Sequence, residues 1–119
     1  MKVFILTLTA LLFTGVACSD PTVCTLSFDY GIIVRVEDSL SGASAAFGAR
    51  LVLRDGAYVD STAVSFDGLH LSGAGERAGS YTVTVQKPTY HDWTRTNVRV
   101  TADECHVKAV SLTARLQPA

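Results

Sequence analysis

The segment Tyr81-Thr82-Val83-Thr84-Val85-Gln86 decides the fold class of this chain of 119 residues. Tyr81, Val83 and Val85 alternate with threonine and glutamine, which places apolar side chains on one face of a strand and polar ones on the other. β-Branched and aromatic residues favour such a half-buried, pleated segment. Lys87-Pro88 follows, and because proline cannot donate a ladder hydrogen bond, the strand is predicted to end there.

The same two-residue period recurs along the rest of the chain. Short strands are predicted at residues 32–36, 49–54, 58–64, 69–71, 81–86, 98–100 and 107–116. In the last of these the apolar residues change from odd to even positions, and a β-bulge near Lys108-Ala109 is predicted to accommodate the change. Turns are predicted at residues 38–44, at Asp55-Gly56 and at the glycine-dense residues 72–79. From residue 30 onward, no segment repeats apolar residues at helical spacing. The pattern predicts an all-β domain of about seven strands, arranged as an antiparallel Greek-key sandwich.

Residues 1–17 have the pattern of a secretory signal peptide. Lys2 supplies a positive end, and residues 3–16 are uncharged and finish in small residues. This run is shorter than the roughly 20 apolar residues of a spanning helix, so a retained transmembrane anchor is the weaker interpretation. We therefore expect an exported protein with a signal peptide at 1–17, a tether at 18–28 and a β-sandwich at 29–117.

The end of the leader, Gly15-Val16-Ala17-Cys18, resembles a bacterial lipobox, in which the cysteine is acylated and becomes the first mature residue. Lipoboxes favour leucine where Gly15 stands, and Gly15 with Ala17 also suits ordinary signal peptidase, which would release a periplasmic or secreted protein. The chain has three cysteines, Cys18, Cys24 and Cys105, and exported proteins rarely contain an unpaired cysteine. Lipidation of Cys18 is favoured because it leaves an even number of thiols. The resemblance implies a lipid anchor on Cys18 that makes the membrane a partner and the cell envelope the location.

Acylation of Cys18 leaves Cys24 and Cys105 as a pair. A disulfide between them would close a loop of roughly 80 residues and contribute about 4 kcal/mol on the chain-entropy model in an oxidising compartment. The alternative is a free, buried Cys105 with Cys24 in the tether. The three cysteines lack the closely spaced ligand pairs of a structural zinc site.

Two stretches carry a resemblance to a family. Residues 32–53, IIVRVEDSLSGASAAFGARLVL, look like the opening of carboxypeptidase regulatory-like domains, and residues 78–85, AGSYTVTV, followed by Pro88-Thr89-Tyr90, are similar to the strand and turn of that family. Thr89 stands where the family usually has glycine. The likeness covers about residues 30–116 and implies a transthyretin-like (prealbumin-like) sandwich that serves as a non-catalytic accessory or carbohydrate-binding-like module. The family has no catalytic residues to transfer to this chain.

The sharpest binding hypothesis concerns Tyr90, His91 and Trp93, which follow the Pro88 turn. Tyr90 and Trp93 could form an aromatic platform for a sugar ring or a peptide. The favoured interpretation is structural, with one ring in the core and the other half-buried on a strand. A glycan- or peptide-binding module is therefore the alternative to a purely structural or interaction module.

The residue pattern gives little support to a metal site or to a catalytic cysteine. His70, His91 and His106, with Asp103 and Glu104, are possible metal ligands, but no two histidines share a spacing that places them on one face of one element, so no metal site is predicted. Cys105 and His106 are neighbours and should diverge on a strand, which argues against a nucleophile and base pair.

Charged residues point to no enzyme and no nucleic-acid ligand. Glu76 and Arg77 are expected in a solvated turn, and residues 95–97 on an exposed face. Lysine and arginine are scattered, and the formal net charge is −1, so nucleic acid is not an expected partner. No serine elbow or phosphate loop occurs, and neither a catalytic site nor a cofactor is predicted. The expected function is a non-catalytic cell-envelope lipoprotein that acts as a structural or interaction module, with an envelope protein or glycan as partner; an enzyme with an unrecognised site is the remote alternative.

Overall fold

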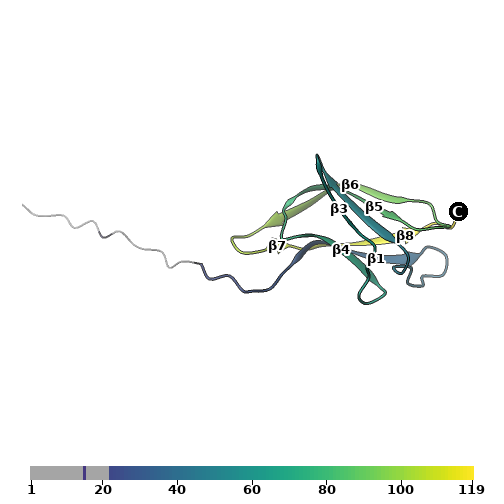
Figure 1. Ribbon diagram of the computed structural model, residues 1–119, viewed down its shortest axis with the longest axis horizontal. Helices are drawn as coiled ribbons and strands as arrows, with labels where there is room; N and C mark the ends of the chain where they lie inside the picture. The colour runs from purple at the N-terminus through teal and green to yellow at the C-terminus, as the bar shows by residue number, and fades with distance from the viewer. Residues whose placement is uncertain (1–14, 16–21) are drawn as a thin grey trace, which may run out of the picture.

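The computed structural model describes residue 15 and residues 22–119, and residues 30–116 form an all-β sandwich (Figure 1). Eight strands follow one another in the order β1 (Tyr30–Asp38), β2 (Arg50–Asp55), β3 (Tyr58–Thr62), β4 (His70–Gly75), β5 (Gly79–Gln86), β6 (Trp93–Ala102), β7 (Val107–Lys108) and β8 (Val110–Leu116). They build a three-stranded sheet, β4-β1-β8, and a five-stranded sheet, β3-β2-β5-β6-β7. The predicted all-β sandwich is confirmed. Among the described residues, no helix is long and apolar enough to cross a membrane.

The five-stranded sheet is antiparallel throughout, and its centre is the β2–β5 pair. Leu51 lies opposite Val85 and Leu53 opposite Val83, so the apolar sets of both strands share one face. β2 returns into β3 through a tight turn at Gly56, whose φ of 57° lies in the left-handed region that glycine adopts without steric cost. The alternation read from the sequence is therefore the alternation of the inner and outer faces of this sheet.

The three-stranded sheet has β1 at its centre and contains one parallel pair. β1 pairs antiparallel with β4 and parallel with β8, from Ile32 opposite Val110 to Asp38 opposite Leu116. β8 is reached from β7, which pairs with β6 in the other sheet. The predicted bulge near Lys108-Ala109 is wrong: the parity changes there because the chain leaves one sheet and joins the other.

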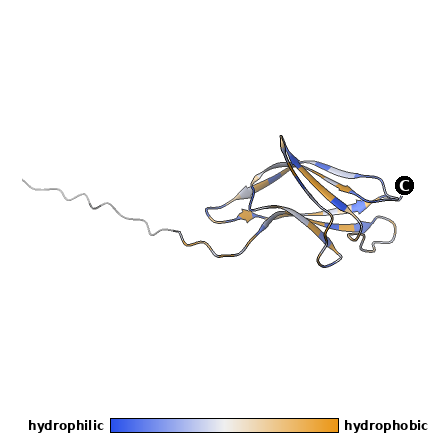
Figure 2. Cartoon of the chain, viewed as in Figure 1, coloured by the Kyte–Doolittle hydropathy of each residue, from blue (hydrophilic) through white to orange (hydrophobic). Residues whose placement is uncertain are grey.

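The core lies between the two sheets and consists of alternate residues from both. Ile32, Val34 and Val36 of β1 are fully buried, as are Leu51 and Leu53 of β2. Apolar residues recur along the strands of both sheets, while the loops are mixed (Figure 2). No polar or charged residue of the described part is fully buried. Core stability therefore comes from aliphatic packing around the ring of Tyr81, which is 1% exposed.

Strand β4 extends through residues that the sequence assigns to a loop. The predicted turn at 72–79 is wrong for residues 72–75, which pair with β1. At Gly73 there is no room for a side chain, because a Cβ would lie 2.7 Å from Cδ1 of Leu53 in the other sheet. A Cβ on Gly75 would meet the exposed ring of Phe28. Close approach of the opposite layer, and not a turn, therefore explains Gly73.

Candidate functional site

The end of the sandwich where the tether enters is closed by a disulfide. Cys24 precedes β1, Cys105 precedes β7, and their sulfurs are bonded with the Cα atoms 5.2 Å apart, which confirms the predicted pair. The extended segment before β1 runs beside the turn that contains Cys105, as Figure 1 shows at the end carrying β7. Cys18, the predicted lipidation site, lies outside the described residues.

Three titratable side chains from distant parts of the chain meet beside this disulfide. Asp29 precedes β1, Glu76 follows β4, and His106 follows Cys105. His106 Nδ1 lies 2.7 Å from Glu76 Oε1 and 3.6 Å from Asp29 Oδ2. One candidate ligand atom from each residue lies within 4.8 Å of the other two. We call these three residues the acid–histidine cluster.

The backbone holds the acid–histidine cluster in place. Glu76 has a φ of 49°, rare for a residue with a side chain, and its N–H donates to the carbonyl of Asp29 over 2.8 Å. The N–H of Asp29 donates in return to Glu76 Oε1, also over 2.8 Å. The N–H of Cys105 and that of His106 donate to Asp103 Oδ1, which shapes the turn before the imidazole. Each member therefore sits on a segment anchored by backbone hydrogen bonds.

The electrostatics of the acid–histidine cluster favour a positive charge at the imidazole. The hydrogen bond to Glu76 raises the pKa of His106 above its usual value. The pKa of Glu76 is lowered, first by the hydrogen bond from the backbone of Asp29 and then by that from His106. The cluster is half-open to water, with 18% of the His106 side chain exposed and 44% of that of Asp29.

The sequence marks His106 as a possible metal ligand but does not reveal its partners. Asp29 and Glu76 are separated by 47 residues, and Glu76 and His106 by 30, so no local spacing could reveal the cluster. The other two histidines are elsewhere: His70 contacts Asp67 through a 2.7 Å pair, and His91 is exposed in the loop after β5. The alternation within one strand shows on which face of the sheet a residue lies, but it does not show which distant loop contacts that residue.

Glu76 lies in an exposed turn, as predicted, whereas Arg77 is only partly exposed and is packed against the neighbouring hairpin. Its guanidinium carbon lies 3.8 Å from the centroid of the Tyr58 ring, and Nη1 lies 3.0 Å from Asp55 Oδ2. The hydroxyl of Tyr81 donates to the carbonyl of Arg77 over 2.8 Å. These contacts tie the β4–β5 loop to the β2–β3 hairpin and indicate a structural role. Residues 95–97 are exposed, as predicted.

The residues of the predicted aromatic platform are occupied by structural contacts. Tyr90 and Trp93 are half-buried and pack against the core, while His91 is exposed. The hydroxyl of Tyr90 donates to Asp38 Oδ2 over 2.7 Å, and the guanidinium carbon of Arg95 lies 5.1 Å from the Trp93 ring. Within residues 22–119, the Tyr90 and Trp93 rings make no ring–ring contact. Ligand binding at Tyr90, His91 and Trp93 stays a prediction.

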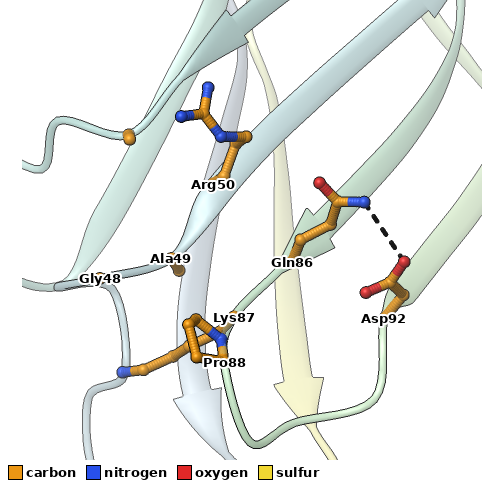
Figure 3. Close-up of a pocket in the computed structure, with 8 residues that line it drawn as sticks. Gly48, Ala49, Arg50, Gln86, Lys87, Pro88 and Asp92 are labelled. Atoms are coloured by element: carbon orange, nitrogen blue, oxygen red, sulfur yellow. Dashed lines mark hydrogen bonds between the residues drawn. The ribbon is translucent and has the colours of Figure 1, made fainter.

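Two shallow hollows flank the five-stranded sheet. The first, of about 370 Å³, lies where β2 begins and β5 ends and is lined in part by Arg50, Gln86, Lys87 and Asp92. Gln86 and Asp92 point toward one another, while Arg50 and Lys87 point in different directions (Figure 3). The second hollow, of about 640 Å³, lies between the start of β5 and the end of β6 and includes Ser80 and Arg99. Each hollow therefore has one arginine of this sheet in its wall.

The outer face of the five-stranded sheet carries exposed arginines that have no acidic partner. Leu51 and Leu53 point inward, so Arg50 and Arg54 point outward, and Arg99 points outward between two buried valines. All three are exposed, and none is within ion-pair distance of a carboxylate in residues 22–119. We call this surface, with these three arginines, the arginine face.

Comparison with known proteins assigns the chain to no family. No family model matches it, and no curated protein is significantly similar to it. The likeness to carboxypeptidase regulatory-like domains therefore stays a prediction from the sequence.

Proposed function

We propose that this protein is an exported, lipid-anchored binding module of the cell envelope, without catalytic activity, that holds an anionic glycan on its arginine face. The observation that carries the proposal is the set of three outward guanidinium groups, Arg50, Arg54 and Arg99, that no carboxylate of residues 22–119 neutralises. Guanidinium groups bind sulfate, phosphate and carboxylate oxygens through paired N–H donors. A ligand with repeated anionic groups fits such a surface.

The opposite sheet provides an internal comparison. Its outer face also carries arginines, but Arg35 lies 3.5 Å and Arg115 lies 3.7 Å from oxygens of Glu37 between them. Both arginines are therefore paired with the same carboxylate, whereas those of the arginine face are paired with none. The formal net charge of the whole chain is −1, so the free cations of the arginine face stand out against an overall acidic molecule.

The remaining side chains of the arginine face favour a glycan over a protein partner. Protein interfaces concentrate aromatic and apolar anchors at their centre. Here the outward residues beside the arginines are mostly hydroxyl or amide side chains, which can hydrogen bond to sugar hydroxyls: Ser61, Ser80, Thr82, Thr84, Gln86 and Thr94. Val52 and Val59 are the aliphatic exceptions.

Two cysteines near the ends of the tether, Cys18 and Cys24, support the proposed membrane anchor. A disulfide between Cys24 and Cys105 indicates an oxidising compartment. Cys18 lies six residues before Cys24, so a lipid there would hold the disulfide end of the sandwich near a membrane. The arginine face is the broad side of the five-stranded sheet and not the disulfide end, which leaves it accessible to envelope polymers (Figure 1).

Binding to heparin, used as a model polyanionic glycan, tests the proposal. We compare the mature protein with the double variant Arg54→Gln/Arg99→Gln and with the matched control Arg35→Gln/Arg115→Gln. Both variants remove two exposed arginines from a sheet surface, so nonspecific attraction falls equally in the two. The proposal expects the first to bind at least about tenfold more weakly than the wild type, which corresponds to about 1.4 kcal/mol, and the control to bind nearly as the wild type does.

Equal losses in the two variants would show that only net charge matters and would contradict an assigned face. Absence of heparin binding by the wild type at low salt would also contradict the proposal. Fractionation of the cells that produce the protein, together with a Cys18→Ala variant, tests the anchor separately.

A further inference from the structure

The contacts of the two ring nitrogens of His106 favour one tautomer of the imidazole. Nε2 lies 3.1 Å from the carbonyl oxygen of Thr25 and 3.0 Å from the Thr25 hydroxyl. A carbonyl oxygen only accepts, so this contact favours the tautomer with hydrogen on Nε2. This leaves Nδ1 facing Glu76 at 2.7 Å and Asp29 at 3.6 Å.

In that tautomer the Nδ1 lone pair faces a carboxylate oxygen, and both atoms are electron-rich. Either a proton on Nδ1 or a metal ion bound there relieves this repulsion. An imidazole that donates its other N–H to a backbone carbonyl, beside oxygen ligands, is the arrangement of a metal-binding histidine.

We propose that Asp29, Glu76 and His106 form a site for a divalent transition-metal ion of the Zn²⁺ class. The site would supply one nitrogen and two oxygens and leave a position for water, which is the ligand number of an open zinc site. Imidazole with carboxylates suits Zn²⁺ better than Ca²⁺ or Mg²⁺, which take oxygen ligands. This inference is independent of the proposed glycan function.

The surroundings preorganise the three ligands. The disulfide joins Cys24, which directly precedes Thr25, to Cys105, which directly precedes His106. It therefore holds the Thr25 carbonyl close to the His106 ring that this carbonyl orients. Glu76 is held toward the site by its backbone at positive φ and by the reciprocal bonds with Asp29. Liganding atoms around tetrahedral zinc are roughly 3.3 Å apart at the usual bond lengths. His106 Nδ1 lies 2.7 Å from Glu76 Oε1 and 3.6 Å from Asp29 Oδ2, so these two distances need to change by about 0.6 Å or less.

Asp29 is the residue whose substitution tests the site most cleanly. In residues 22–119 its carboxylate makes no hydrogen bond and no ion pair other than that with His106, so Asp29→Asn should leave the fold unchanged. His106→Asn removes the nitrogen ligand but also the bond to Thr25. His91→Asn is the matched control, because His91 is exposed in the loop after β5.

The experiment is calorimetric titration of the oxidised, tag-free mature protein with Zn²⁺ alone, combined with imidazole ¹⁵N NMR. No reductant is present, because free thiols would bind zinc themselves. We expect one bound equivalent, a shift of the His106 Nδ1 resonance, and affinity at least about tenfold lower in Asp29→Asn and His106→Asn. His91→Asn should bind as the wild type does.

The proposal would be overturned if no binding occurred at millimolar Zn²⁺ and His106 carried protons on both ring nitrogens at neutral pH. A proton on Nδ1, and not a metal ion, would then lie between His106 and Glu76. Binding that Asp29→Asn leaves unchanged, or that His91→Asn removes, would overturn it as well. If His106→Asn does not fold, the Asp29→Asn titration still decides.

Discussion

The hydroxyl of Tyr90 donates a 2.7 Å hydrogen bond to Asp38 Oδ2 and so joins the loop after β5 to the end of β1. Asp38 also accepts from the backbone N–H groups of Leu40 and Ser41, each over 2.8 Å. Together these bonds lower the pKa of Asp38 from 3.8 to about 2, with the Ser41 backbone as the largest cause and the Tyr90 hydroxyl the next. One carboxylate therefore links both sheets to the turn after β1.

Removal of the Tyr90 hydroxyl should make the stability of the fold depend less on pH in the acid range. Because the folded pKa of Asp38 lies below the unfolded value, its contribution is full above pH 3.8 and is lost as the pH falls toward 2. We expect Tyr90→Phe to lower the melting temperature at pH 7, and the gap to the wild type to narrow between pH 4 and pH 2. Thermal melts across this range, with Tyr30→Phe as the control, check it. A gap that stays constant down to pH 2 would count against the linkage.

The disulfide should carry a large share of the stability. The bond joins residues 81 positions apart, and on the chain-entropy model closing such a loop contributes about 4 kcal/mol. Urea unfolding of Cys24→Ala/Cys105→Ala should show that loss, and reduction of the wild type should reproduce it. The double variant should not respond to reductant. A loss below about 1 kcal/mol would mean that the bond constrains the unfolded chain very little.

A side chain at Gly73 should destabilise the sandwich. A Cβ there would lie 2.7 Å from Leu53 Cδ1 and 3.0 Å from Asp60 Oδ2, and Leu53 is fully buried. We expect Gly73→Ala to cost about 1–3 kcal/mol of unfolding free energy, the range for overpacked cores. Ser72→Ala, one position earlier and facing the other way, is the control and should be nearly neutral. Equal stability of the two variants would refute close packing as the reason for this glycine.

Fluorescence of Trp93, the single tryptophan, separates the two glycan hypotheses. Trp93 lies opposite Val85, on the inner parity of the five-stranded sheet, whereas the arginine face lies on the outer parity. Binding of heparin should therefore leave the emission maximum unchanged. A shift that depends on ligand concentration and disappears in Tyr90→Ala would favour the aromatic platform instead.

Local alternation predicted much of the fold because each strand has one buried face. Val83 and Val85 pack inward as their spacing indicates, and the same holds for Leu51 and Leu53. The strand predicted at residues 69–71 is shorter than β4, because Gly73 looks like a loop residue and only the neighbouring sheet shows that it makes room for Leu53. The parity change at Ala109 was misread because a bulge and a change of sheet leave the same local pattern.

The candidate sites were less accessible to sequence reasoning than the fold. The disulfide could be proposed from cysteine counting, since it depends on which thiols remain. The acid–histidine cluster could not, because it is assembled from loops before β1, after β4 and before β7. The arginine face depends on which strands are neighbours: Arg54 and Arg99 lie on β2 and β6, on either side of β5.

The proposed function depends on a sandwich held at the membrane through Cys18, and the intact mass of the mature protein from the envelope fraction tests this most directly. We predict a chain that begins at Cys18, carries the added mass of acyl groups, and gains the mass of two hydrogen atoms on reduction of the Cys24–Cys105 bond. A chain that begins at or near Cys18 without acyl mass would contradict the anchor and describe a periplasmic or secreted protein.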